Sequence, residues 1–110
     1  MRYALVIVHP PSDLKSQSRT IRFGRALIEN GHEVSRVFFY GDGTQIGCPD
    51  ASKTREQWME LTSPFDTELA ICSASGEKNG VVKAPNHFLL AGLGALMESG
   101  FDCDRVITCA

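Results

Sequence analysis

Four apolar runs along the chain have the composition of buried strands. The clearest of them, Tyr3 to Val8, is a continuous apolar run that ends before two prolines, a pattern typical of a strand covered on both faces of a parallel sheet. We predict these strands at Tyr3 to Val8, His32 to Tyr40, Glu68 to Cys72 and Asp104 to Cys109. Val81 and Val82 predict either a brief further strand or a packed loop.

Apolar residues at helical spacing predict a first helix between the first two strands. Ser16 or Ser18 is suited to cap its start, and the helix is expected to run to about Asn30. Gly31 is suited to the position just past the helix end. A loop over residues 41–49 follows the second strand.

Two further helices are predicted later in the chain. The second spans Ser52 to Leu61, and Thr54 and Gln57 within it have the spacing of a capping box. Gly100 is expected to end the last helix. The apolar residues predicted to form the buried face of that helix are Leu89, Leu93, Leu96 and Met97.

Strands that alternate with helices predict βαβ units, and therefore an α/β fold with a mainly parallel sheet flanked by helices on both faces. A chain of 110 residues supports one such domain, which we expect to span residues 1–110. In folds of this kind, ligands and reactive groups lie at the carboxyl ends of the strands. Three places meet that condition, namely His9-Pro10, Gly41 to Gly43 and Cys72-Ser73.

Composition disfavours several classes of function. The 11 basic and 13 acidic residues give a net charge of −2, which argues against a surface basic enough for direct nucleic-acid binding. No apolar stretch reaches the roughly 20 residues that span a bilayer, and the apolar run that stops at His9 is too short for a signal peptide. We therefore expect a cytoplasmic protein that binds neither membrane nor nucleic acid.

The chain contains four cysteines, Cys48, Cys72, Cys103 and Cys109, and no two of them form a Cys-x-x-Cys pair. The three histidines do not supply the missing ligand spacing, so we predict no metal site. Structural disulfides are also disfavoured in a cytoplasmic protein. The chemistry to explain is therefore that of free thiols.

Cys72 is the strongest candidate among these thiols. It stands at the predicted end of the third strand, before four small residues that leave a sulfur accessible: Ser73, Ala74, Ser75 and Gly76. If a short helix begins there, its first N–H groups stabilise a thiolate or persulfide anion, and Lys78 adds a positive charge. His9 pairs with Cys72 as its base if the first and third strands are neighbours. The alternative is a small buried cysteine without a chemical role.

Two other thiols and one glycine loop complete the set of candidates. Cys109 and Cys48 are candidates for an auxiliary thiol, whereas neighbouring carboxylates disfavour a thiolate at Cys103. The Gly41 to Gly43 loop resembles a phosphate loop only superficially, because the glycine spacing is wrong and no Lys-Ser or Lys-Thr follows. A small-ligand binding domain that uses this loop is nevertheless an alternative function.

Short segments throughout the chain match one known family in its own order. They are Arg2-Tyr3-Ala4-Leu5-Val6, Ala26-Leu27-Ile28, Gly31-His32-Glu33, Val37-Phe38-Phe39-Tyr40 with Gly43, Trp58, Ile71-Cys72, Gly80-Val81-Val82, Leu90 to Leu96 and Cys103-Asp104-Arg105-Val106. Together with a cysteine at the expected strand end, they resemble the DsrE-like sulfur relay family, and within it the TusD/DsrE subunit type.

The resemblance implies a DsrE-like fold of the Rossmann or flavodoxin kind and a sulfurtransferase that acts as a sulfur carrier. In this family the cysteine that matches Cys72 accepts sulfane sulfur as a persulfide and passes it to a partner protein. TusD-type members act in the 2-thiouridine modification of transfer RNA, and DsrE-type members act in cytoplasmic sulfur oxidation. Because persulfide transfer is thiol exchange, no cofactor is expected.

The resemblance also implies partners. Paralogous small subunits, TusB/TusC-like or DsrF/DsrH-like, form a hetero-oligomer with this type of chain, and a homo-oligomer is the alternative. A TusA-like protein donates the sulfur and a TusE/DsrC-like protein accepts it.

Two features leave a rival interpretation open. Family members often carry a basic pair after the cysteine, whereas this chain has one acid, Glu77, and one base, Lys78. Small families of this fold also contain paralogues that serve as a non-catalytic scaffold or regulatory subunit. Under that interpretation Cys72 is buried and inert.

Overall fold

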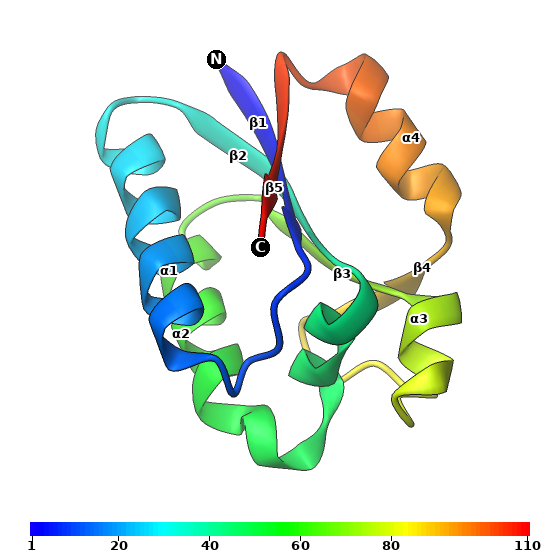
Figure 1. Ribbon diagram of the computed structural model, residues 1–110. Helices are drawn as coiled ribbons and strands as arrows, with labels where there is room; N and C mark the ends of the chain where they lie inside the picture. Colours follow the sequence, from blue (N-terminus) through cyan, green and yellow to red (C-terminus); the bar gives the residue numbers. More distant parts are fainter.

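The computed structural model describes residues 1–110 as a five-stranded, all-parallel sheet with helices on both faces (Figure 1). The strands stand in the order β4-β3-β2-β1-β5. Their bounds are β1 (Arg2–Ile7), β2 (Glu33–Phe39), β3 (Glu68–Cys72), β4 (Leu89–Ala91) and β5 (Arg105–Cys109). The predicted α/β class is confirmed, and the four predicted strands agree with the structure to within one residue at each end.

The strand register places residues of neighbouring strands side by side, with their side chains on the same face of the sheet. Val6 of β1 pairs with Phe38 of β2, and Phe38 in turn pairs with Ala70 of β3. Because every pair is parallel, the carboxyl ends of all strands lie at the same edge of the sheet, and β1 and β5 run downward toward it in Figure 1. The short helices η1 (Gly41–Gly47) and α3 (Ser73–Lys78) follow β2 and β3 at that end.

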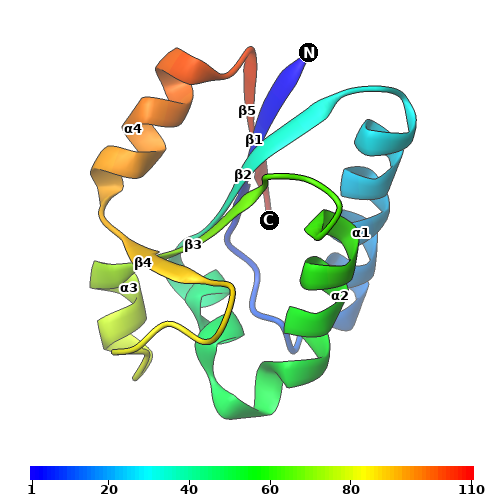
Figure 2. The same cartoon turned by 180° about the vertical axis from the view of Figure 1, so that it is seen from behind.

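Two helices, α1 (Leu14–Glu29) and α2 (Ser52–Thr62), cover one face of the sheet (Figure 2). Trp58 of α2 is fully buried there and meets Phe39 of β2 edge-on, with 5.8 Å between the ring centroids. This main core consists of Leu5, Ile7, Ile21, Leu27, Val34, Val37, Phe39, Ile46, Trp58, Leu69, Ile71, Val81 and Phe88. Removing these apolar side chains from water is the main source of the fold's stability.

A single helix, α4 (Leu93–Asp102), covers the opposite face. The buried core on this side is small and consists of Phe38, Ala70 and Cys72. Ala95 and Leu96 of α4 pack against it, together with Ala91 at the end of β4. The layer between α4 and the sheet is therefore thin.

The structure corrects the prediction for the last helix. Leu89 belongs to β4, a three-residue strand that the sequence pattern did not reveal. Leu93 and Met97, predicted to be buried, are 50% and 67% exposed. The helix also passes through Gly100 and ends at Asp102.

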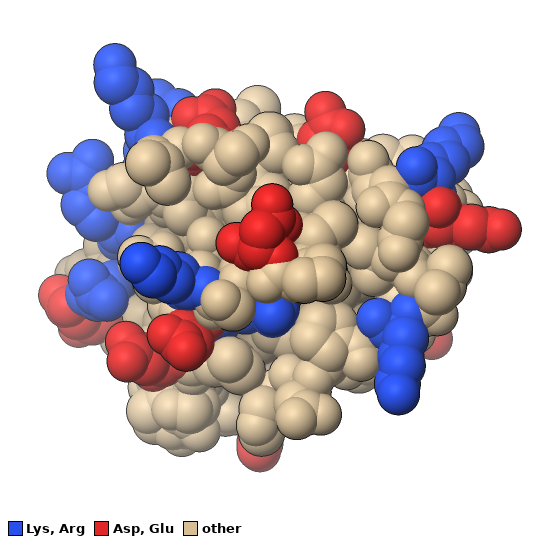
Figure 3. All heavy atoms as spheres, turned by 90° about the horizontal axis from the view of Figure 1, so that it is seen from below, with Lys and Arg blue, Asp and Glu red and all other residues tan.

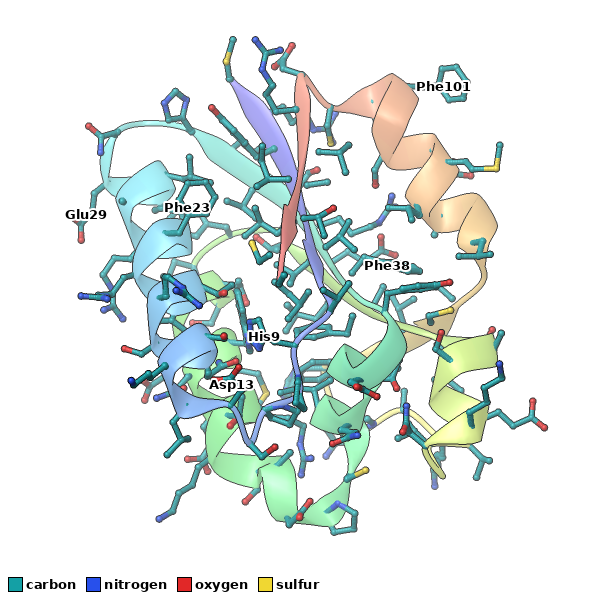
Figure 4. All side chains as sticks on the ribbon, in the orientation of Figure 1. His9, Asp13, Phe23, Glu29, Phe38 and Phe101 are labelled. Atoms are coloured by element: carbon teal, nitrogen blue, oxygen red, sulfur yellow. The ribbon has the colours of Figure 1, made fainter.

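The physical reason is that α4 turns small side chains toward the sheet. Ala95 packs on the small core, and Ser99, one turn later, is 1% exposed. Residues three and four apart share one face of a helix, so the larger Leu93, Met97 and Phe101 form a separate stripe that faces outward. Figure 4 shows Phe101 pointing away from the sheet.

The predicted second helix starts at Ser52, as α2 (Ser52–Thr62) does, but the caps predicted for the first and second helices are both wrong. Asp13, rather than Ser16 or Ser18, caps α1, and its carboxylate accepts hydrogen bonds from the Ser16 N–H and hydroxyl. The short helix η2 (Pro49–Ala51) leads directly into α2, which has no side-chain cap. Thr54 and Gln57 therefore form no capping box. The predicted role of Gly31 agrees with its left-handed backbone, with φ of +83°, just beyond α1.

The predicted loop over residues 41–49 is instead two 3-10 helices, η1 and η2. η1 passes so close to β1 that a Cβ atom on Gly43 would lie 2.1 Å from the Ile7 carbonyl oxygen. Val81 lies in a packed loop and is 4% exposed, which decides between the two predicted alternatives at that position. None of the helices has the length and apolar character needed to cross a bilayer.

Candidate functional site

Cys72 ends β3 at the carboxyl end of the sheet, directly before α3. Its side chain lies on the α4 face, as does that of Ala70 two residues earlier, because alternate strand residues share a face. The residue is 1% exposed and belongs to the small core with Phe38 and Ala70, against which Ala95 and Leu96 of α4 pack. In Figure 4, Phe38 lies between the sheet and α4. The small residues after Cys72 therefore do not expose its sulfur, because α4 covers it.

α3 gives Cys72 a helix start but no capping hydrogen bond. Cys72 occupies the N-cap position with an extended backbone, and its side chain accepts no bond from the first turn. The residues predicted to stabilise the anion follow in α3: Ser73 and Ala74 are exposed, Ser75 is half-buried and Gly76 is buried. Lys78 is exposed in the last turn. The structure thus places these residues next to Cys72 in the chain, with the sulfur on the covered side.

Asn79 fastens α3 to η1 and was not predicted as a site residue. Its side-chain amide donates hydrogen bonds to the Gly41 carbonyl oxygen, the Thr44 hydroxyl and the Ser75 carbonyl oxygen. The segments that follow β2 and β3 are therefore tied together beside Cys72. An asparagine just beyond a short helix was the available sequence signal, because its side chain readily bonds to nearby backbone groups.

Arg36 fastens α4 to the sheet and is the second residue that the sequence analysis missed. Its guanidinium donates hydrogen bonds of 2.7 Å to the Ala95 carbonyl oxygen and to the Ser99 hydroxyl, and it pairs with the Glu68 carboxylate of β3. The Arg36 and Glu68 side chains are only 16% and 33% exposed. An arginine inside an otherwise apolar strand was the signal, since a charge at such a position requires partners.

His9 lies on the α1 side of the sheet and not with Cys72 (Figure 4). The residue is 5% exposed, its Nε2 lies 3.0 Å from the Thr20 hydroxyl, and its Nδ1 lies 3.3 Å from the Pro10 carbonyl oxygen. β2 stands between β1 and β3, so the condition for a His9–Cys72 pair, neighbouring strands, is not met. His9 instead ties the end of β1 to α1.

Cys109 ends β5 opposite Ile7 of β1, on the main-core side. Burial raises the pKa of its thiol, and a hydrogen bond with the Thr20 hydroxyl offsets part of that effect. A thiol of this kind stays protonated near neutral pH. Cys109 is thus placed across the sheet from Cys72.

The remaining cysteines lie apart from Cys72 as well. Cys48 is half-buried between η1 and η2, with its sulfur 3.8 Å from the Asn79 carbonyl oxygen. Cys103 follows α4, and its sulfur lies 3.1 Å from the Ser35 hydroxyl. All four thiols are free, and no group of three or more His, Cys, Asp or Glu side chains is arranged to hold a metal ion.

The model of the DsrE/DsrF-like family matches residues 1–109 of the chain. The chain belongs to the DsrE/DsrF-like family. This membership agrees, at the level of the family, with the resemblance seen in the sequence. It is established at the level of the family and covers the strand end that carries Cys72.

Solved structures share the DsrE/DsrF-like fold seen here. The ychN protein from E. coli matches with a TM-score of 0.75 at 17% identity, over 98% of this chain and 99% of its own. MTH1491 from Methanobacterium thermoautotrophicum matches with a TM-score of 0.78 at 17% identity, over 96% and 97% of the two chains. BT1422 from Bacteroides thetaiotaomicron matches with a TM-score of 0.66 at 11% identity, over 96% and 93%. The last two are described as proteins of unknown function, and these likenesses concern the fold alone.

Proposed function

We propose that this DsrE/DsrF-like protein is a sulfur carrier, a sulfurtransferase of the TusD/DsrE type that holds sulfane sulfur as a persulfide on Cys72. The observation that carries the proposal is a free thiol at the carboxyl end of β3, an internal strand followed directly by a helix, in a chain of which residues 1–109 match the family. That end of a parallel sheet is where reactive groups are found in α/β folds.

The proposed chemistry is two successive thiol exchanges. In loading, the Cys72 thiolate attacks the outer sulfur of a donor persulfide, a new S–S bond forms, and the donor leaves as a thiolate that takes up a proton. In unloading, an acceptor thiolate attacks the outer sulfur on Cys72, and Cys72 leaves as a thiolate. Each exchange makes one S–S bond and breaks one, so no external oxidant or reductant is consumed.

Loading requires the sulfur of Cys72 to become reachable. The core cluster that contains Cys72 is covered by Ala91, Ala95 and Leu96, which belong to the β4–α4 segment. We propose that a docked donor displaces this segment. An apolar cover also protects a persulfide from water and stray thiols between loading and unloading, which a carrier needs.

The partners follow from the same proposal. A TusA-like protein is the proposed donor and a TusE/DsrC-like protein the proposed acceptor. TusB/TusC-like or DsrF/DsrH-like subunits, or further copies of this chain, complete the oligomer. The proposed setting is cytoplasmic, in 2-thiouridine modification of transfer RNA or in sulfur oxidation.

The burial of Cys72 favours one second candidate, a scaffold or regulatory subunit without a working thiol. Cys72 is 1% exposed and makes no capping hydrogen bond, and both properties are also typical of a buried cysteine without a chemical role. The two functions differ in whether Cys72 can take up sulfur.

Intact-mass analysis after incubation with a cysteine desulfurase, cysteine and a TusA-like donor tests the proposal. The wild type, Cys72→Ser and Cys48→Ser are treated in parallel, and any added sulfur is located by peptide mapping. Cys48→Ser is the matched control, because Cys48 is a more exposed thiol near the same end of the sheet.

We expect one added sulfur on Cys72 in the wild type and in Cys48→Ser, and none in Cys72→Ser. Sulfur confined to Cys48 or Cys109, or no adduct with a donor that loads a known carrier, contradicts the proposal. That result favours the scaffold subunit instead.

A further inference from the structure

Basic side chains gather on the outer face of α1. Lys15, Arg19, Arg22 and Arg25 follow one another three or four residues apart, and all are exposed. Lys53 of α2 is exposed beside them and lines a groove together with Arg22 and Arg25. These are five of the 11 basic residues of the chain. Figure 3, a view onto the carboxyl ends of the strands, shows most of the visible Lys and Arg side chains on the left, the side of α1 and α2.

None of these five cations forms a salt bridge, although Arg19 lies near enough to Asp13 to act on its charge and donates a hydrogen bond to the Ser16 hydroxyl between them. The salt bridges of the protein join Arg2 to Glu33 and Arg36 to Glu68. The two carboxylates of α1 and its cap, Asp13 and Glu29, lie at opposite ends of the helix (Figure 4). The whole chain has a net charge of −2, so this cluster of positive charge is not visible in the composition. It appears only when the fold places the five basic side chains on one face.

Three of these cations, Arg22, Arg25 and Lys53, line the groove between α1 and α2, which we call the α1/α2 groove. It has a volume of about 570 Å³ and one acidic lining residue, Glu60. The amides of Gln17 and Gln57 also line it. Leu14, at the start of α1, lines it too and is 73% exposed, an apolar side chain among charges.

We propose that the α1/α2 groove docks an acidic segment of a partner protein. Arginine guanidiniums bind carboxylates with two parallel hydrogen bonds, so Arg22 and Arg25 suit glutamate or aspartate side chains of such a segment. Leu14 offers contact to an apolar side chain of the same segment. The groove lies across the sheet from Cys72, so this inference does not rest on the proposed function.

A protein segment fits the groove better than a nucleic acid does. Proteins that bind single strands stack bases on aromatic side chains, and the residues that line the groove include none. The acidic remainder of the chain repels an extended polyanion, whereas a short acidic segment meets mainly the cations within one Debye length, about 8 Å.

Fluorescence anisotropy with a labelled peptide tests the proposal. The probe is an amphipathic peptide of glutamate and leucine at helical spacing. The same peptide with glutamine in place of glutamate serves as a neutral probe, and a single-stranded RNA of equal charge serves as the nucleic-acid probe. The variants are Arg22→Glu/Arg25→Glu and the matched control Lys78→Glu/Lys83→Glu, which makes the same change in net charge at exposed lysines outside the groove.

We expect the acidic peptide to bind, with an affinity that falls as salt rises, and the neutral peptide to bind weakly. Arg22→Glu/Arg25→Glu should raise the Kd about tenfold or more, while Lys78→Glu/Lys83→Glu should change it less than about twofold. The proposal is overturned by absence of peptide binding, by equal loss in both double variants, or by tighter binding of the RNA. Cys72→Ser should bind the peptide like the wild type, which separates this result from the fate of the sulfur-carrier proposal.

Discussion

The two faces of the sheet are covered to very different depths. On one face, α1 and α2 bury a continuous core around Trp58 and Phe39, each at most 1% exposed. On the other face, α4 alone packs on a small core of Phe38, Ala70 and Cys72 and turns Met97 and Phe101 toward solvent. Local opening follows regions with few buried apolar contacts. The α1/α2 face therefore contributes most of the stability. Cys72 lies under α4, on the face where local opening requires less free energy.

The largest effect should come from truncating the thick core. Trp58→Ala removes a fully buried ring that contacts Phe39, and we expect a loss of about 4 kcal/mol in the free energy of unfolding. That is a large part of the total of about 5 to 15 kcal/mol for a typical domain. Urea unfolding measures it, and a variant that does not fold also agrees with the prediction.

The matched change on the thin face is Leu96→Ala. Leu96 is only half-buried, so we expect a loss of about 1 to 2 kcal/mol. Leu93→Ala, which truncates a 50% exposed side chain of the same helix, should cost less than about 0.5 kcal/mol. Equal losses for Trp58→Ala and Leu96→Ala would show that the two faces contribute alike to stability.

The second prediction concerns the attachment of α4. Arg36→Met removes the donors to Ala95 and Ser99 and leaves Glu68 without its partner, so we expect a loss of about 2 kcal/mol. Because α4 covers Cys72, the rate of alkylation of Cys72 by iodoacetamide should also rise severalfold. Mass spectrometry of the alkylated peptides measures that rate.

The alkylation rate of Cys48 is the internal control for Arg36→Met, since Cys48 has no contact with α4 and should react as in the wild type. Arg36→Lys keeps the positive charge but loses the planar guanidinium with its several donors. The alkylation rate of Cys72 in this variant should lie between those of the wild type and Arg36→Met. A less stable Arg36→Met protein with an unchanged Cys72 rate would mean that α4 does not limit access to the thiol.

The contrast between the faces also explains what the sequence could predict of the fold. A continuous apolar run such as Tyr3 to Val8 identifies a buried strand without knowledge of its neighbours. β4 has only three residues, too few for a period of two to stand out. In α4 the large apolar residues suggested the wrong buried face, because the sheet beneath selects small residues such as Ala95 and Ser99.

For the candidate site, the sequence predicted where each residue lies relative to the strands, but not which side chains surround it. Cys72 ends β3 and His9 follows β1, as the apolar pattern indicated. Which face each side chain joins depends on strand order and on the residue's parity within the strand, so their separation across the sheet could not be foreseen. Arg36 meets Ala95 and Ser99 some sixty residues further along the chain, and no local pattern links them.

The smallest predicted effect tests the start of α1 on the thick face. The Ser16 side chain and backbone N–H bond the Asp13 carboxylate and hold its pKa below the ordinary 3.8. A lowered folded-state pKa means that Asp13 stabilises the fold above the unfolded pKa, and that this contribution is lost as the pH falls through the folded pKa. Asp13→Ala should therefore lower Tm by a few degrees at neutral pH, and its difference from the wild type should shrink below about pH 4.

Asp13→Asn separates the cap from the charge, because the amide oxygen still accepts a hydrogen bond but does not titrate in this range. Its Tm at neutral pH should lie near that of the wild type, and the two should diverge on acidification, with the wild type losing more. Neither variant should change the alkylation rate of Cys72, since Asp13 holds α1 and not α4. If Asp13→Ala accelerated that rate as Arg36→Met does, the two faces would open as one cooperative unit, and the thin cover over Cys72 would have no independent motion through which a donor could reach the thiol.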